Sequence, residues 1–271
     1  MRPGLARLPH VADSPSPALF VRDAQAAAYA SHKRQVLQAQ PRRAPVGAAE
    51  PAVLTEIAQA YLAQTGIHLA PEADALAEGM QEDFVILHGE SDGAGDTMRA
   101  RFLSVCFPSN WDPAEKLGLD FATIHAPVAD NALLQAGARG IIDMAFRQAP
   151  MLRHVWLLTP GGDLAQHPET RRTRWDDAVG AADTANGRLI DQVFFRVERQ
   201  TTLPLPALRR GVFFIRVLVA PLADVLAAAP GRSAALRDAL LSMSDAVVAY
   251  RGMAAVRERL CAELALATSG D

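Results

Sequence analysis

The sequence predicts an α+β domain, with a curved antiparallel sheet of about five strands and helices before, between and after them. The first observation is a pair of runs rich in Val, Ile and Phe, at Leu189–Thr201 and Gly211–Val219, joined by a Pro-rich connection. The second is a hairpin pattern, in which Asp83–His88 and Met98–Phe107 flank the turn-forming segment SDGAGD. A further strand is expected at Leu152–Thr159.

Helical patterns surround these strands. Pro51 suits the first position of a helix and Gly66 suits its end, and the apolar residues between them recur at helical spacing. The segment 163–187 is polar and weakly patterned, so we interpret it as an excursion from the sheet. The expected helices span about Arg22–Gln38, Pro51–Gln64, Ala132–Gln148, Leu222–Ala229, Ser233–Met243 and Gly252–Ala267.

Composition narrows the functional classes. The 271 residues are half hydrophobic, and the net charge of −3 argues against a general nucleic-acid-binding surface. Two cysteines make neither a disulfide framework nor a Cys-rich metal site. No apolar run approaches the roughly 20 residues of a membrane span, and no secretory signal is recognisable. We expect a soluble cytoplasmic protein, with residues 1–19 as an N-terminal arm and 20–271 as one domain.

Charged residues interrupt the two central strands. Because alternate residues of a strand share a face, Arg196 and Glu198 point to one side and Arg199 to the other. Arg216 interrupts an otherwise apolar run. Since unpaired buried charge is costly, these residues indicate either a buried polar site or cross-strand ion pairs on a solvated face.

Two aromatic side chains are candidates for a pocket wall. Ala126 precedes Pro127 and is therefore biased towards extended backbone, which predicts that His125 lies in a loop or at a strand edge. The residues alone leave open whether His125 is a metal or heme ligand or a structural histidine. Trp156 lines either a pocket or the ordinary core.

Four segments occur together in one family and in its order: QEDFVIL at 81–87, VCFPSNWDPAEKLG at 105–118, IHAPV at 124–128, and RVERQTTLPLP with GVFFIRVLVAPL at 196–222. On these residues the chain resembles the heme-dependent oxidative N-demethylase family, whose heme subunit has a PAS-like fold. The resemblance spans about residues 20–260. Its most specific part is RVERQT followed by FxIR.

The resemblance implies a b-type heme in a PAS-like pocket. It also implies O₂-dependent demethylation of a small secondary amine such as dimethylamine, which yields the shorter amine and formaldehyde. Electrons would arrive from a reductase whose FMN and iron–sulfur cluster lie on partner subunits of a hetero-oligomeric complex. No Cys-rich iron–sulfur loop is recognisable in this sequence, so the donor would be another polypeptide.

Carried onto this chain, the resemblance makes His125 the axial iron ligand. Arg196 and Glu198 match an RxE pair at the substrate pocket, where a carboxylate suits an alkylammonium group. From charge alone, Arg199 or Arg216 is expected to pair with the heme propionates. Trp156 is expected at the cofactor, although the chain has Val-Trp at 155–156 where the family has Asn-Trp.

Two other functions are compatible with the same fold. A heme-based PAS sensor would report O₂ or redox state without turnover, since one fold hosts many functions. A heme-free structural subunit of a larger enzyme is the third reading. The sensor would tolerate loss of Glu198, whereas an amine-oxidising enzyme would lose substrate binding.

Overall fold

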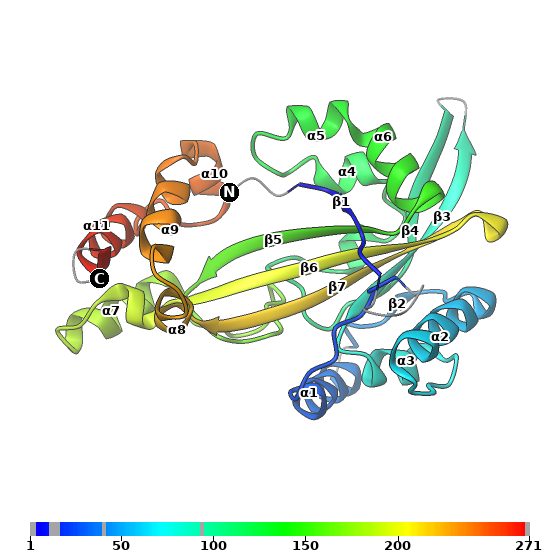
Figure 1. The fold of residues 1–271 in the computed structure, drawn as a ribbon, viewed down its shortest axis with the longest axis horizontal. Coiled ribbons are helices and arrows are strands. Elements are labelled where there is room, and N and C mark those ends of the chain that lie inside the picture. The colour runs from blue at the N-terminus through cyan, green and yellow to red at the C-terminus, as the bar shows by residue number, and fades with distance from the viewer. Residues whose placement is uncertain (1–3, 11–16, 40–41, 93–94, 269–271) are drawn as a thin grey trace.

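The computed structural model describes residues 4–10, 17–39, 42–92 and 95–268. Its centre is one antiparallel sheet in the order β1-β5-β6-β7-β3-β4-β2 (Figure 1). The α+β, PAS-like fold class is confirmed. The strands are β1 (Ala6–Arg7), β2 (Val46–Gly47), β3 (Asp83–Asp92), β4 (Gly95–Ser104), β5 (Met151–Thr159), β6 (Phe194–Leu205) and β7 (Arg210–Pro221).

The five long strands correspond to the five that were predicted, while β1 and β2 were missed. Each of the missed strands has only two residues, too few to show an alternating pattern. The tip of the predicted hairpin, residues 93–94, lies outside the described residues. Several expected strand boundaries shift by a few residues. At the start of β6 the reason is local, because Leu189–Gln192 forms a 3₁₀ turn (η3) and the strand begins after it.

The central pair β6 and β7 is joined by the 3₁₀ turn η4 (Pro206–Leu208) and is paired from Phe194↔Pro221 to Leu205↔Arg210. β3 joins β7 only from Ile215 onwards towards the turn, so the far part of β7 has an open edge. There the Tyr29 hydroxyl donates to the Val217 carbonyl at 2.6 Å. The first helix therefore covers a strand edge that would otherwise expose backbone groups.

Of the three helices near the N-terminus, the second and third pack on one face of the sheet, and the first lies along the open edge of β7 (Figure 1). Phe20 makes edge-to-face contacts with Tyr61 and with Phe214 of β7, each at 5.0 Å between ring centroids. Gly66 ends the second helix in the left-handed conformation (φ 71°), as its position predicted. The helices are α1 (Ala26–Gln38), α2 (Pro51–Thr65) and α3 (Ala73–Gly79).

The opposite face is covered by the segment between β4 and β5 (Figure 1). The single helix expected over 132–148 is broken at Gly137 and ends in a π-helical turn, since glycine is a weak helix former. A 3₁₀ turn, η1 (Ala114–Lys116), follows Asp112, whose carboxylate accepts from the Ala114 amide. The other elements are α4 (Phe121–His125), α5 (Ala132–Ala136), α6 (Ala138–Asp143) and η2 (Met144–Gln148).

The remaining helices gather at the end of β5 and β6 that lies away from the β3–β4 hairpin (Figure 1). Two of them were not among the expected helices: one lies within the segment interpreted as an excursion, and the other follows Ser244, whose hydroxyl accepts from the Val247 amide. No helix in the described part of the chain combines the length and the apolarity needed to cross a membrane. The helices are α7 (Trp175–Thr184), α8 (Leu222–Ala227), α9 (Arg232–Leu241), α10 (Asp245–Tyr250) and α11 (Arg257–Thr268).

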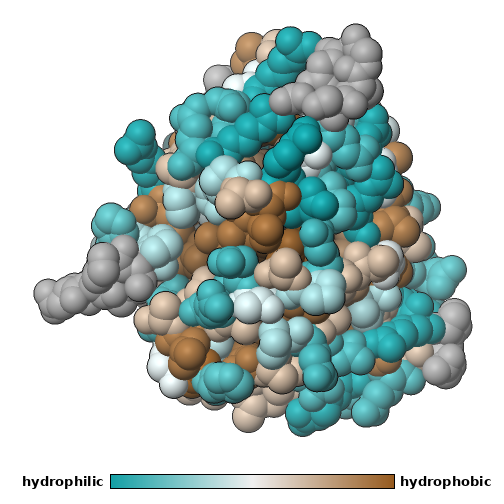
Figure 2. Space-filling model, turned by 90° about the vertical axis from the view of Figure 1, so that its right-hand side faces the viewer, coloured by the Kyte–Doolittle hydropathy of each residue, from teal (hydrophilic) through white to brown (hydrophobic). Residues whose placement is uncertain are grey.

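Figure 2 views the molecule from the β3–β4 end, the right-hand side of Figure 1. Apolar side chains gather near the middle of this face, with hydrophilic ones around them. Met144, at the start of η2, has 42% of its surface exposed, whereas Phe146 in the same turn is buried. The turn thus packs one side against the sheet and leaves the other in solvent.

Candidate functional site

A cavity of about 1130 Å³ lies between the sheet and the α4–α6 segment, and it extends to residues around α10. Typical small-molecule sites measure roughly 300–1,000 Å³, so this one is large. Its walls are mainly apolar, with a few polar side chains on the sheet. The apolar set includes Val85, Leu87, Met98, Leu103, Ile124, Phe146, Val155 and Phe213.

His125 lines this cavity from the last residue of α4. The prediction that His125 lies in a loop or at a strand edge was wrong. The helix forms because Asp120 caps it by accepting from the Thr123 amide. The turn also continues through Ala126, which is helical (φ −56°, ψ −36°) despite the proline that follows it. Local capping therefore overrides the preference of a residue before proline.

The His125 ring is held in one orientation. Its Nδ1 lies 2.7 Å from the Phe121 carbonyl oxygen, and the two rings pack with centroids 4.1 Å apart. Because a carbonyl only accepts, Nδ1 carries the proton and Nε2 keeps its lone pair. Nε2 has no hydrogen-bond partner among the residues that the structure describes. Such an imidazole is arranged as a metal ligand usually is.

Burial lowers the pKa of His125, and this effect outweighs the hydrogen bond to the Phe121 carbonyl, which raises the pKa. The positive charge of Arg153 lowers the pKa further. A pKa below the ordinary value of 6.5 keeps the imidazole neutral at physiological pH. Metal ligation requires the neutral form.

Glu198 lies on the sheet wall of the same cavity. One carboxylate oxygen accepts from the Ser109 hydroxyl, and the other accepts from Gln200 Nε2 at 2.9 Å. Val155 is its partner across the strand pair β5–β6. The carboxylate is therefore fixed by two neutral donors and keeps its charge available to a cation in the cavity.

Arg196 stands one step behind this wall. Its guanidinium is fully buried, and it is not among the residues that line the cavity. Nε donates to the Ser109 hydroxyl at 2.8 Å, and the other nitrogens donate to the carbonyls of Phe107, Asp163 and Leu164 at 3.0–3.1 Å. Arg196 thus reaches Glu198 through Ser109, and it ties two loops to the strand.

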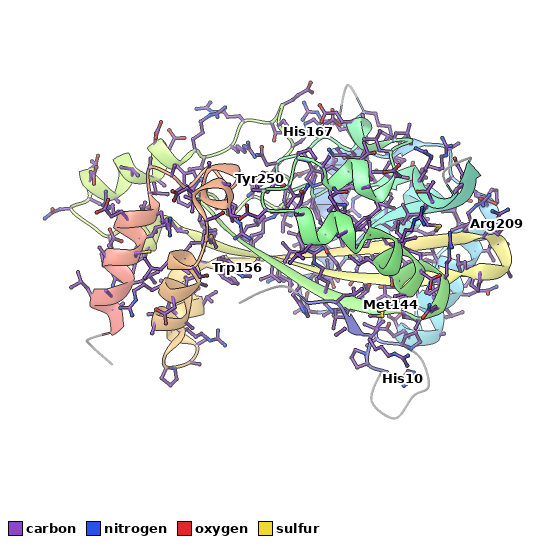
Figure 3. The ribbon with its side chains drawn as sticks, turned by 90° about the horizontal axis from the view of Figure 1, so that it is seen from above. His10, Met144, Trp156, His167, Arg209 and Tyr250 are labelled. Atoms are coloured by element: carbon purple, nitrogen blue, oxygen red, sulfur yellow. The ribbon has the colours of Figure 1, made fainter. Side chains whose placement is uncertain are left out.

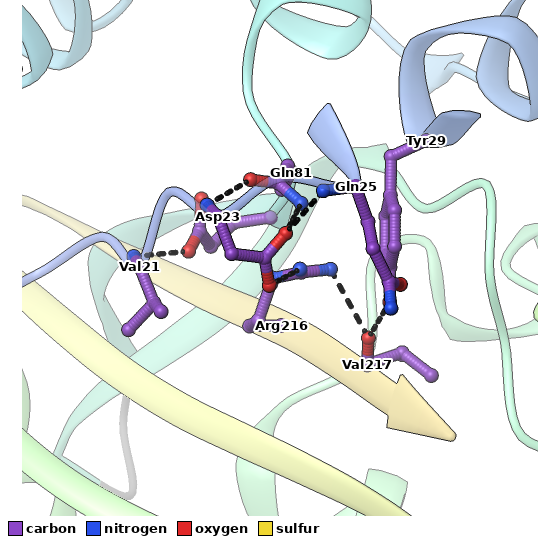
Figure 4. Close-up of polar contacts among 8 residues, drawn as sticks. Val21, Asp23, Gln25, Tyr29, Gln81, Arg216 and Val217 are labelled. Atoms are coloured by element: carbon purple, nitrogen blue, oxygen red, sulfur yellow. Dashed lines mark hydrogen bonds and ion pairs between the residues drawn. The ribbon is translucent and has the colours of Figure 1, made fainter. Parts of the chain in front are cut away.

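Arg199 and Arg216 lie on the other face of the sheet. Arg199 donates to the carbonyls of Ala18 and Leu19. Arg216 pairs with Asp23 at 2.9 Å and lies over the Tyr29 ring at 3.8 Å (Figure 4). Neither arginine lines the cavity, because strand residues alternate in direction and both point away from Glu198. The expected pairing of either with a cofactor in this cavity is not available to them.

Trp156 is also turned away from the cavity. Its ring stacks on Phe195 with centroids 5.7 Å apart, and Arg251 lies 5.0 Å from its centre. It belongs to the apolar cluster of the C-terminal helices, towards which it lies in Figure 3. Of the two readings left open for this residue, the structure favours the core.

Sequence reasoning missed most of the polar residues that line the cavity, among them Ser109, Arg153 and Gln200 around Glu198. Ser109 belongs to an irregular segment, so no periodicity indicates its direction. The other two carry a usable signal. Gln200 lies two residues from Glu198 on β6, and Arg153 lies two residues from Val155, the cross-strand partner of Glu198, so period two places both on the cavity face.

Among the described residues, no three His, Cys, Asp or Glu side chains come together in a group that could hold a metal ion. Cys106 is buried, and burial raises the pKa of its thiol to about 12, so it stays protonated. His125 is therefore the side chain of the cavity best suited to bind a metal. It would be the single protein ligand of a cofactor that supplies the other metal ligands itself.

A search of the curated proteins finds no match to this sequence. A family model described as "Haem-dependent oxidative N-demethylase, alpha subunit-like" matches residues 56–261. This match covers well over half of the 271 residues and includes His125, Arg196 and Glu198. The chain therefore belongs to the haem-dependent oxidative N-demethylase, alpha subunit-like family.

Proposed function

We propose that this chain is a heme-binding oxygenase subunit that demethylates a small secondary amine of the dimethylamine kind. The products would be the shorter amine and formaldehyde. The reaction would use O₂ and electrons from a separate reductase that carries FMN and an iron–sulfur cluster. One observation carries the proposal: the unpartnered Nε2 of a fixed, neutral His125 and the carboxylate of Glu198 share one large cavity.

A b-type heme suits this cavity. The porphyrin brings four nitrogen ligands, so the protein needs to supply only one, and His125 is oriented to do so. The apolar walls suit the porphyrin ring, and the volume of about 1130 Å³ leaves room for a small substrate beside it. When bound, the heme supplies the O₂ chemistry of the reaction, and the protein supplies position and electrostatics.

His125 would hold the iron through Nε2. The bond from Nδ1–H to the Phe121 carbonyl fixes the tautomer and the ring plane, and such second interactions also raise the basicity of the ligand. The Phe121 ring packed against the imidazole limits its rotation further. The short helix α4 thus holds Nε2 of His125 in one position.

Glu198 would bind the ammonium group of the substrate. A carboxylate in a partly dry cavity attracts a cation more strongly than it does in water. Ser109 and Gln200 orient its two oxygens, and Arg196 positions Ser109 from behind. The apolar walls exclude water from the N-methyl groups. Arg196 is therefore proposed as a positioning residue rather than one that touches the substrate.

The proposed electron donor is a different polypeptide. The family description refers to an alpha subunit, which supports an assembly of several subunits. Two cysteines do not supply the four thiolates of a ferredoxin-type cluster, and no group of three or more His, Cys, Asp or Glu side chains comes together among the described residues. We therefore propose that flavin and iron–sulfur cofactors reside on partner chains.

The test is an absorption spectrum of the purified chain, followed by replacement of His125. The wild type should show a Soret band that changes with dithionite and with dimethylamine. His125→Ala should weaken hemin binding by more than the roughly 10- to 100-fold that loss of an outer-shell partner costs. His154→Ala is the matched control, because His154 is exposed on the other face of β5.

An unchanged spectrum and hemin affinity in His125→Ala would overturn the ligand assignment. Turnover is tested separately. With an electron donor and O₂, dimethylamine should yield formaldehyde in proportion to the amine consumed. A chain that binds heme and responds to O₂ but forms no formaldehyde would instead be the sensor considered above.

A further inference from the structure

We propose that Arg153 is a carboxylate-binding group of the cavity, and that it is reserved for a bound molecule rather than for the fold. Two molecules could bring the carboxylate: the heme, through a propionate, or an amine substrate that also carries an acid group. The inference rests on the proposed function, because heme and an amine are ligands of this cavity only under that function. The experiments below separate the two sources.

The placement of Arg153 follows from the register of the sheet. On β5 it lies opposite Gln200 of β6, and its neighbour Val155 lies opposite Glu198. Alternation along both strands puts Arg153, Gln200 and Glu198 on the face that carries the cavity, and all three line it. His125 lines the same cavity from α4.

Arg153 is exceptional among the arginines of the central strands because its guanidinium has no hydrogen bond or ion pair with any residue that the structure describes. Arg196, Arg199, Arg210 and Arg216 all have such partners. Arg153 is half-buried, and burial lowers its pKa. A cation removed from water without a partner costs stability, so the fold alone gives no reason for it.

The nearest acid does not take up this cation. The charge of Glu198 acts on Arg153 and opposes the effect of burial on its pKa, so the two groups are neighbours. Both oxygens of Glu198 nevertheless accept hydrogen bonds from other side chains, Ser109 and Gln200. The cavity thus keeps an anion and a cation apart, and each remains available to a group of opposite charge.

The chemistry of a guanidinium selects the ligand. Its planar set of donors matches a carboxylate with two parallel hydrogen bonds, and its charge repels an alkylammonium group. Lys116 also lines the cavity without a partner in the described part of the chain. Its single ammonium on a flexible stem lacks that geometric match, so Lys116 serves as a control for the charge of the cavity.

The first arm tests the heme propionate. Hemin and its dimethyl ester, which lacks the carboxylates, are titrated separately into the heme-free full-length chain. If Arg153 holds a propionate, Arg153→Gln should weaken hemin binding roughly 10- to 100-fold and leave binding of the ester unchanged. Arg153→Lys should recover part of the affinity, and Lys116→Gln should change it less.

The second arm tests a substrate carboxylate. Dimethylamine and N,N-dimethylglycine are titrated into the heme-loaded chain, with the Soret band as the signal. If Arg153 receives the acid group of the substrate, Arg153→Gln should weaken binding of N,N-dimethylglycine by a similar factor and leave dimethylamine unaffected. Either selective loss supports the proposal and identifies the source of the carboxylate.

The third arm needs no heme, so it remains informative if the proposed function fails because the wild type binds no hemin. Without protein partners to lose, Arg153→Gln should melt at the same temperature as the heme-free wild type or higher. A melting temperature lowered beyond that of the exposed control Arg34→Gln would overturn the proposal, because it would show a structural role. Equal affinities of wild type and Arg153→Gln for all four ligands would overturn it as well.

Discussion

The charged residues on the two faces of the strand pair β6–β7 differ in their bonding partners. On the face towards the N-terminal helices, Arg199 and Arg216 lie directly opposite each other, a placement that is unfavourable for like charges. Asp23 and the carbonyls of Ala18 and Leu19 offset it. These arginines fasten the N-terminal segment to the sheet, and their role is to hold the fold.

On the cavity face, the charged groups are positioned but not neutralised. Glu198 accepts from the neutral donors Ser109 and Gln200, and Arg153 has no partner among the described residues. Arg196 is the exception, since its bonds to backbone carbonyls lie behind the cavity wall. Whether an arginine within a strand serves the fold or a functional site is therefore decided by its bonding partners.

The largest expected effect falls on the structural face. Arg216 is fully buried over Tyr29, and its partner Asp23 has 38% of its side chain exposed (Figure 4). Breaking a buried pair costs about 3–5 kcal/mol, and since Asp23 can regain water we expect about 3 kcal/mol for Arg216→Ala. Urea unfolding of the heme-free chain measures this loss.

The exposed control Arg34→Ala should change the free energy of unfolding by less than about 1 kcal/mol. The hemin affinity of folded Arg216→Ala should equal that of the wild type. If Arg216→Ala unfolds at the same urea concentration as the wild type, Arg216 does not stabilise the fold, and the proposed difference between the two faces is wrong.

An intermediate effect is expected at the cavity face. Glu198→Gln removes the negative charge and keeps the shape of the side chain, with one of its two acceptor oxygens replaced by an amide donor. Loss of a charged hydrogen bond should weaken dimethylamine binding roughly 10- to 100-fold, with hemin content unchanged. Titration of the Soret band measures it. Glu115→Gln is the matched control, because Glu115 also lines the cavity but is exposed. If both variants bind the amine as the wild type does, Glu198 is not its partner.

The smallest effect concerns acid stability. Burial tends to raise the pKa of Asp23, but hydrogen bonds from Gln81 and the Gln25 amide, together with Arg216, bring it below the ordinary value of 3.8 (Figure 4). The folded state therefore binds this proton less readily than the unfolded state does. The stabilisation is present above pH 3.8 and is lost as the pH falls through the folded pKa.

Unfolding midpoints of the wild type and Asp23→Asn should accordingly converge as the pH falls below 3.8. Asp238→Asn, an exposed position on α9, should show no such convergence. A difference between wild type and Asp23→Asn that stays constant with pH would contradict the lowered pKa.

Much of the sheet was predictable because its signals are local. Alternation along 194–205 correctly separated Glu198 from Arg199, and the hairpin at 83–104 was expected from its turn residues. Pro51 and Gly66 bounded their helix correctly. The position of His125 was not predictable, because the preference of Ala126 before proline was outweighed by the cap at Asp120. The break at Gly137 follows from the weak helix propensity of glycine, a local signal that the prediction of one helix over 132–148 did not use.

By itself, the sequence determined the fold class, the pairing of the central strands and the opposite directions of Arg196 and Arg199, because the side-chain period of a strand is a local property. Its motifs also pointed to His125 and Glu198. The tertiary structure was needed to show which face of the sheet borders the cavity and that Arg199 and Arg216 bind the N-terminal segment. It was also needed to show that Arg153 shares the cavity with His125 and Glu198 and has no partner among the described residues. The period of two determines only that neighbouring side chains point to opposite faces. The partners on each face come from distant segments, 89 residues away for Ser109 and Glu198 and 181 for Ala18 and Arg199.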